Sequence, residues 1–178
     1  AELMNPAEDV LILYTTSHGA PYGIVNSDGN EGYGAISPNR LARLLDAFGI
    51  HRRLLIVSAC YSGVFVPVLS GPQTMIISAA ASDRSSFGCV AENDWTFFGD
   101  ALINRALRKP QPLAPAVTEA VGLIDGWERQ GNLKPSLPQQ SMGAEVQQWL
   151  TPLEARMPRA ATRPVGRPSI DSLSAVQR

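Results

Sequence analysis

Three short runs of apolar residues recur along the first half of the chain and predict its strands. They occupy residues 10–15 (VLILYT), 54–58 (LLIVS) and 74–78 (TMIIS). Continuous apolar runs of this length, rich in β-branched residues, are typical of strands that are buried on both faces of a parallel sheet. We therefore expect the three segments to pair in parallel within one sheet.

A helical pattern fills the space between the first two runs. Ser37 and Pro38 make a favourable N-cap and first helical residue, and Gly49 supplies a stop signal. Between these signals the apolar residues share one helical face: Leu41, Leu44, Leu45 and Phe48. A strand, a helix and a second strand in this order predict a βαβ unit.

Helical spacing returns at 95–107 and 115–127, and a glycine-rich segment separates the first strand from the first helix. In that segment, 23–25 and 33–36 flank a Ser-Asp-Gly-Asn turn, which predicts a hairpin. Strands that alternate with helices in this way indicate an α/β layered domain.

Composition narrows the class of protein. The 178 residues are 44% hydrophobic and 17% charged, with a net charge of −1. This balance excludes a chain that is disordered throughout, and it argues against a general partner of nucleic acid or anionic membranes. We expect no membrane-spanning helix, because polar residues interrupt the longest apolar stretch. Only two cysteines and two histidines occur, so we expect neither a disulfide framework nor a metal or other cofactor.

The C-terminal part changes character. Prolines and arginines dominate after about residue 151, with few acidic residues. We therefore expect one domain over residues 1–156 and a Pro/Arg-rich tail over 157–178 that is mostly disordered.

Two residues whose side chains could take part in catalysis follow consecutive predicted strands. His18-Gly19 comes after the first run, and Cys60 comes after the second. Parallel strands bring both to one edge of the sheet, which suits a cysteine nucleophile with a histidine acid/base. The Gly19 and Cys60 N–H groups are candidate oxyanion donors, and a helix or turn after Cys60 would favour its thiolate. Taken singly, such a cysteine is most often a small buried hydrophobe, and a His-Gly pair is usually only a turn.

The ordered motifs resemble the legumain-type peptidases, the C13 family of the caspase-like clan, which also includes the catalytic subunit of glycosylphosphatidylinositol transamidase. Ala59-Cys60-Tyr61-Ser62-Gly63 is similar to the Ala-Cys-x-Ser-Gly block of that family. Downstream, Ser85-Ser86-Phe87-Gly88-Cys89 is similar to its Ser-Ser-aromatic-small-Cys segment, and Gly99-Asp100 to a small-Asp pair. The likeness covers roughly Val10 to Leu107.

The resemblance implies a caspase-like three-layer sandwich with a mostly parallel central sheet. It also implies a cysteine endopeptidase of peptide or protein substrates, with Cys60 as nucleophile and His18 as general acid. By the same resemblance, Ser86 and Asp100 line the pocket for the substrate residue before the scissile bond (P1). Cys89 matches a family cysteine that is not catalytic.

Departures from the family leave alternatives open. Ser58 stands where legumain has an acidic residue that helps to recognise asparagine, and Ser17 stands where it has aspartate. The family also carries a strand and a helix before the histidine strand. The nine residues before Val10 are too few for them, so we expect this unit to be missing from the chain unless another segment takes its place.

Several functional interpretations therefore remain. The resemblance implies Asn as the P1 residue, whereas the negative charge of Asp100 also favours a basic P1 residue. In the alternative interpretation, Asp100 only stabilises the N-terminus of a helix. The alternative to a peptidase is a catalytically silent caspase-like module that binds proteins. A transamidase variant differs only in its amine nucleophile. Oligomeric state and compartment stay open; we expect a soluble chain, and the bacterial periplasm and secretion are the candidate locations.

Overall fold

The computed structural model describes residues 4–27, 33–157 and 160–167. The chain divides into two compact units, and each is described here on its own. Unit 1 comprises residues 1–85 and 138–152, and unit 2 comprises residues 86–137 and 153–178.

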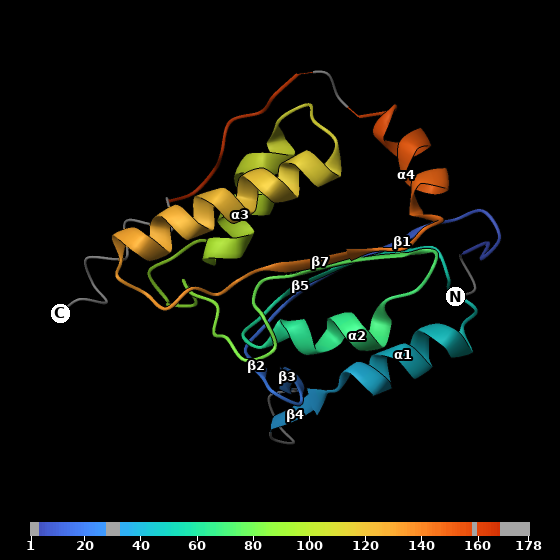
Figure 1. The fold of residues 1–178 in the computed structure, drawn as a ribbon, viewed down its shortest axis with the longest axis horizontal. Helices are drawn as coiled ribbons and strands as arrows, with labels where there is room; N and C mark the ends of the chain where they lie inside the picture. The colour runs from blue at the N-terminus through green and yellow to red at the C-terminus, as the bar shows by residue number, and fades with distance from the viewer. Residues whose placement is uncertain (1–3, 28–32, 158–159, 168–178) are drawn as a thin grey trace. The chain divides into compact units, whose positions relative to one another are not determined.

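Unit 1 is built on a four-stranded sheet (Figure 1). Its strands are β1 (Leu11–Thr16), β5 (Arg53–Ser58), β6 (Thr74–Ser78) and β7 (Gln139–Met142), in the order β1-β5-β6-β7. β1, β5 and β6 pair in parallel, which confirms the three predicted strands and their direction. β7 pairs antiparallel with β6 and was not predicted.

The three parallel strands differ in burial. β5 and β6 are buried along their whole length, as their continuous apolar sequences predict. β1 instead alternates between half-buried and exposed residues, and Ile12 and Tyr14 are 61% and 39% exposed. The prediction that β1 is buried on both faces is therefore wrong for the part of the chain described. Among the described residues, β1 forms the edge of this sheet and pairs with β5 alone.

The predicted crossover helix forms as α1 (Pro38–Ala47). The Ser37 side chain accepts a hydrogen bond from the Arg40 N–H at 3.2 Å, and Gly49 adopts a left-handed φ of 65° just beyond the helix. The predicted apolar face is only partly buried. Leu45 lies in the core, whereas Leu44 and Phe48 are exposed.

A second, smaller sheet follows β1. It contains β2 (Gly19–Ala20), β3 (Gly23–Ser27) and β4 (Tyr33–Ile36), all antiparallel. The pairing of β3 with β4 confirms the predicted hairpin. Residues 28–30 of its predicted turn lie outside the described residues.

After β5 the chain makes a short 3₁₀ helix, η1 (Ser62–Phe65), and then α2 (Val66–Leu69). α1 and α2 lie along the same side of the sheet in Figure 1. Between them and the strands lies an apolar core: Ile24, Leu45, Ile50, Leu55, Val57, Ala59, Phe65, Leu69 and Ile76. α4 (Val146–Glu154) follows β7, and its Trp149 indole donates to the Gln73 carbonyl at 3.2 Å.

Unit 2 contains η2 (Gly99–Arg105), η3 (Ala106–Arg108) and α3 (Leu113–Gln130), with η2 packed against α3. The helix predicted at 115–127 is confirmed in α3. The helix predicted at 95–107 is present, but η2 is π-helical and η3 is 3₁₀. Three apolar residues of this segment are buried: Phe98, Ala101 and Leu102.

Residues 160–167 run extended along unit 2, and backbone hydrogen bonds hold them there. The Thr162 N–H donates to the Arg108 carbonyl at 2.8 Å, and the Arg167 N–H donates to Asp94 at 2.7 Å. These residues belong to the range predicted as a disordered tail. Residues 168–178 lie outside the described part, and the predicted domain boundary stays a prediction.

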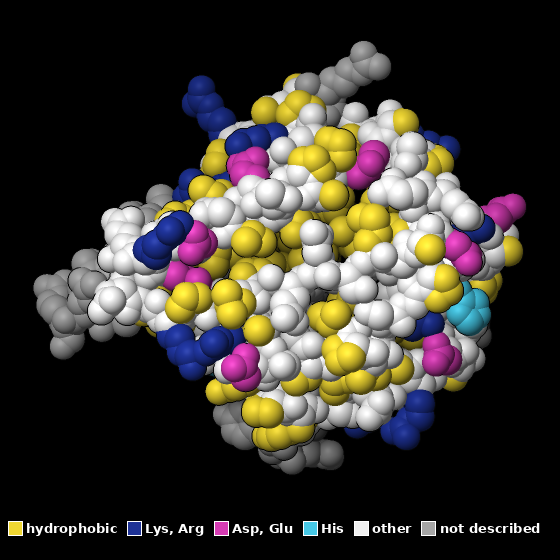
Figure 2. All heavy atoms as spheres, viewed as in Figure 1, with side chains coloured by type: hydrophobic (Ala, Val, Ile, Leu, Met, Phe, Trp, Pro, Cys, Tyr) yellow, Lys and Arg dark blue, Asp and Glu magenta, His cyan; other side chains and the backbone are white. Residues whose placement is uncertain are grey.

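Together the elements form an α/β fold with a mostly parallel central sheet. On the face in Figure 2, the described Lys and Arg side chains lie scattered among Asp and Glu side chains. Among the described residues, no helix is both long and apolar enough to cross a membrane.

Candidate active site

The strand register of unit 1 brings His18 and Cys60 to one edge of the sheet. Thr16, the last residue of β1, pairs with Ser58, the last residue of β5. One residue later, the Ser17 N–H donates to the Ser58 carbonyl at 3.2 Å. His18 and Cys60 each stand two residues beyond these strand ends, so the prediction that they share an edge is confirmed.

Gly19 lies directly against the backbone of Cys60. A Cβ at Gly19 would fall 1.9 Å from the Cys60 carbonyl oxygen, well inside van der Waals contact. Glycine is therefore the residue that this approach allows. His18, immediately before it, is exposed, and Cys60 is half-buried, so both are accessible from solvent.

The hydrogen bonds of the small sheet orient the Gly19 N–H. The Val25 N–H donates to the His18 carbonyl at 2.8 Å, which makes His18 and Val25 a bonded pair of the β2–β3 ladder. Bonded and non-bonded pairs alternate in an antiparallel ladder, and Gly19 with Ile24 is the next pair. The Gly19 N–H therefore points away from β3.

Ser17 has a structural partner of its own. Its hydroxyl donates to the Val25 carbonyl at 2.7 Å and so ties the end of β1 to β3. A serine at this position, where legumain carries aspartate, thus helps to fix the turn that contains His18.

The chain turns sharply after Cys60. Tyr61 adopts a left-handed conformation with φ 58° and ψ 12°, and its N–H donates to the Arg84 carbonyl at 2.8 Å. η1 begins at the next residue, as predicted for a helix or turn after the cysteine.

The predicted substrate-binding residues are divided between the two units. Ser58 is in unit 1, where its side chain is buried at the end of β5. Ser86 and Asp100 are in unit 2; Ser86 is half-buried and Asp100 is 0% exposed.

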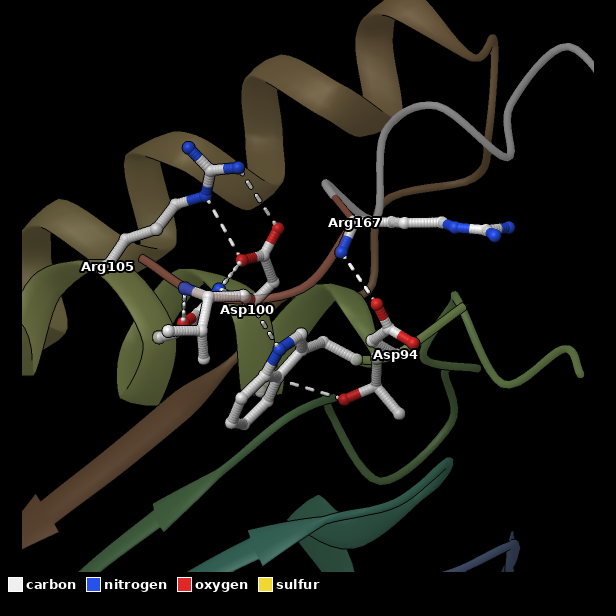
Figure 3. A network of polar contacts seen from close by, with 9 residues as sticks. Asp94, Asp100, Arg105 and Arg167 are labelled. Atoms are coloured by element: carbon white, nitrogen blue, oxygen red, sulfur yellow. Dashed lines mark hydrogen bonds and ion pairs between the residues drawn. The ribbon is translucent and has the colours of Figure 1, made fainter. Parts of the chain in front are cut away.

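Asp100 belongs to a dense polar network within unit 2 (Figure 3). Its Oδ1 accepts a hydrogen bond from the Asn104 side-chain amide at 2.8 Å and lies 3.2 Å from Nε of Arg105. Its Oδ2 accepts a hydrogen bond from Nη2 of Arg105 at 3.3 Å. Arg105 also lies over the Trp127 ring, 5.3 Å from its centroid. The negative charge of the Asp100 carboxylate is thus compensated by the Arg105 guanidinium of the same helix.

Asn104 connects this network to the extended segment 160–167. Its Oδ1 accepts from the Val165 N–H at 2.9 Å, and its Nδ2 donates to the Val165 carbonyl at 2.9 Å. The Trp95 indole donates to the same carbonyl at 3.0 Å.

Sequence analysis missed Asn104 and Arg105. The i, i+4 spacing of Asp100 and Asn104 was the available signal for the first. Arg105 stands five residues after Asp100, a spacing that an α-helix does not bring together. The π-helical wrapping of η2, with its i→i+5 repeat, does so.

A cavity of about 340 Å³ opens in unit 1 at the other end of the strands. It is lined by the first residues of β5 and β6, Arg53 and Thr74, and by Asp46 and Glu145. An Arg53–Asp46 ion pair of 2.7 Å closes part of its wall. This cavity contains none of the predicted site residues, and the length of β5 places it about 20 Å from Cys60.

Two further ionisable groups lie in unit 2. Cys89 is an exposed cysteine. Burial raises the pKa of Glu128 in α3, although the Ser136 N–H donates to both of its carboxylate oxygens at 3.1 Å and opposes that shift. Among the described residues, no group of three or more His, Cys, Asp and Glu side chains is placed to hold a metal ion.

Comparison with known families matches residues 2–120 to the model of the Peptidase C13 family. The chain belongs to the Peptidase C13 family. Membership supports a caspase-like fold, indicates cysteine peptidase activity and implies a protein substrate. A search of curated proteins finds no match.

Proposed function

We propose that this C13 family member is an endopeptidase that hydrolyses peptide bonds through a thioester on Cys60, with His18 as general acid and base. The observation that carries the proposal is the contact of the His18-Gly19 turn with the Cys60 backbone. That contact lies at the carboxyl edge of two parallel strands, where α/β enzymes place their reacting groups.

In this mechanism the Cys60 Sγ, as thiolate, attacks the carbon of the scissile carbonyl. The carbonyl oxygen gains the negative charge, and the N–H groups of Gly19 and Cys60 stabilise it. His18 donates a proton to the leaving amine, the C–N bond breaks and a thioester remains. Water then attacks the thioester with His18 accepting its proton, and the product carboxylate and the Cys60 thiolate are released.

For substrate selection we propose that Ser58, Ser86 and Asp100 each contribute to recognition of the P1 side chain, as the family resemblance implies. Ser58 and Asp100 are buried, so we expect each of them to act by orienting its own neighbours. Arg105 already compensates the charge of Asp100. We therefore expect an amide side chain such as Asn to be preferred over a basic one, because the Asp100 carboxylate is already paired and attracts a second cation less strongly.

The test is digestion of a diverse peptide mixture, read by mass spectrometry. We expect cleavage by the native chain and by Cys89→Ala, the matched cysteine control, and none by Cys60→Ala. Asn should be enriched before the cut. Retained cleavage by Cys60→Ala would overturn Cys60 as nucleophile, and enrichment of Lys or Arg would overturn the preference for an amide.

A native chain that cleaves nothing, and whose Cys60 does not react faster than Cys89 with a peptide electrophile, would point instead to a silent binding module. The periplasmic or secreted location and the lack of nucleic-acid partners stay predictions.

A further inference from the structure

The backbone immediately after Cys60 is held in a disfavoured conformation. Tyr61 has a φ of 58°, in the left-handed region that residues with a side chain rarely adopt. Tyrosine has no short polar side chain to stabilise that region, so the conformation costs about 1 kcal/mol or more. Such a residue persists only where its surroundings impose it.

Hydrogen bonds from the loop after β6 impose the Tyr61 conformation. The Tyr61 N–H donates to the Arg84 carbonyl at 2.8 Å. The next side chain, Ser62, accepts a hydrogen bond from the Ala80 N–H at 3.2 Å, and both of these residues are buried. The turn is thus tied at two successive residues to residues 80–84.

Backbone contacts close the turn on two sides. A Cβ at Gly63 would lie 2.5 Å from the Ser82 nitrogen and 2.7 Å from the Ala81 carbonyl carbon. On the other side, Gly19 meets the Cys60 carbonyl. Cys60 therefore stands between two places where backbone touches backbone without an intervening side chain.

We propose that the Tyr61–Gly63 turn is a positioning device for the Cys60 thiol and that Ser62 is its positioning residue. This inference rests on the proposed function and deepens it. Thiolate attack requires the sulfur about 3–3.5 Å from the carbonyl carbon and aligned with it. The Ser62 hydroxyl keeps the turn against residues 80–84, and the turn fixes the direction in which the Cys60 side chain leaves the backbone.

The decisive comparison is Ser62→Ala with Ser78→Ala. Ser78 is a second buried serine that bonds to the same loop, because its hydroxyl donates to the Ala80 carbonyl at 3.1 Å, whereas Ser62 accepts from the Ala80 N–H. We expect both variants to lose a similar amount of Tm. Ser62→Ala should also lose at least about tenfold in kcat with KM unchanged, whereas Ser78→Ala should keep the native kcat.

A second variant guards against failure to fold. Tyr61→Gly accepts the left-handed conformation without strain, so we expect its Tm to stay close to the native value. Its kcat should nevertheless fall, because glycine frees the turn beside the nucleophile. Equal kcat in Tyr61→Gly and the native chain, or equal kcat in the two serine variants, would show that the turn is merely structural.

Alkylation of Cys60 by iodoacetamide separates this inference from the proposed function. The reagent needs no substrate pocket, and mass spectrometry distinguishes Cys60 from Cys89. If the native chain hydrolyses no peptide, the proposed function fails. The pH profile of Cys60 alkylation then still tests the positioning role of Ser62. A profile that is altered in Ser62→Ala and native in Ser78→Ala supports this role. Profiles that are identical in both variants and the native chain overturn it.

Discussion

The strands that precede His18 and Cys60 lie side by side, but they are held very differently. β5 has a partner strand on both sides and is buried throughout, whereas β1 is an edge strand whose outward residues are exposed. Cys60 therefore follows a strand in the buried interior of the sheet, and His18 follows a strand at its margin. This difference suits the roles proposed for them, a nucleophile that must be aimed and an acid/base that must serve two partners in turn.

The contact between the two strand ends offers the most severe way to break this arrangement. Gly19→Ala places a Cβ against the Cys60 carbonyl. We expect a loss of about 3 kcal/mol in the free energy of unfolding and at least about 100-fold in kcat/KM. Denaturant unfolding and peptide turnover measure both effects.

The matched control for that substitution is Gly34→Ala in β4, where the nearest described atom to a Cβ would be the Asn26 carbonyl oxygen, at 3.8 Å. Similar losses in both variants would refute the contact as the cause.

Removing a matched isoleucine from each strand tests the difference in burial directly. Ile56 in β5 is 4% exposed, and Ile12 in β1 is 61% exposed. We expect Ile56→Ala to cost about 3 kcal/mol in the free energy of unfolding, and Ile12→Ala less than about 0.5 kcal/mol. Chemical denaturation measures both losses. Equal losses in the two variants would mean that Ile12 is buried in solution and would contradict the difference between the strands.

A moderate effect is expected at the helix that connects the two strands. Ser37→Ala removes the side-chain acceptor of the Arg40 N–H at the start of α1. We expect a loss of about 1 kcal/mol in the free energy of unfolding. Ser37→Asp retains an acceptor and should recover the native value; failure to recover it would assign the loss to another cause.

The smallest effect is expected outside both strands, at Glu128. Its pKa is raised by burial, so the stability that its protonated form contributes is lost as pH rises from the ordinary value of 4.5 through the raised one. Glu128→Gln cannot ionise, so it should not lose this stability. As pH rises over this interval, its free energy of unfolding relative to that of the native chain should increase by less than about 1 kcal/mol. A difference independent of pH would contradict the shift.

Much of unit 1 was predictable because its signals are local. The apolar runs that became β1, β5 and β6, and the Ser37-Pro38 start of α1, carry their structure in neighbouring residues. β7 has the sequence Gln-Gln-Ser-Met and no apolar period. It is a strand because the free edge of β6 pairs with it, which only the tertiary structure decides.

The candidate site was predictable to a similar extent. His18, Gly19 and Cys60 could be placed from strand ends and chain order. The left-handed turn at Tyr61 could not, because its cause is the distant carbonyl of Arg84. Nor could the pairing of Asp100 with Arg105, because it depends on a π-helical repeat that residue spacing does not encode.

The glycines beside Cys60 also set limits on sequence variation. Every single-base change of a glycine codon that alters the amino acid adds a Cβ atom or ends translation. Libraries of random variants should therefore be depleted of all substitutions at Gly19 and Gly63, where backbone atoms occupy that position. Gly122 and Gly126 in α3 have open space there and should accept many alternatives.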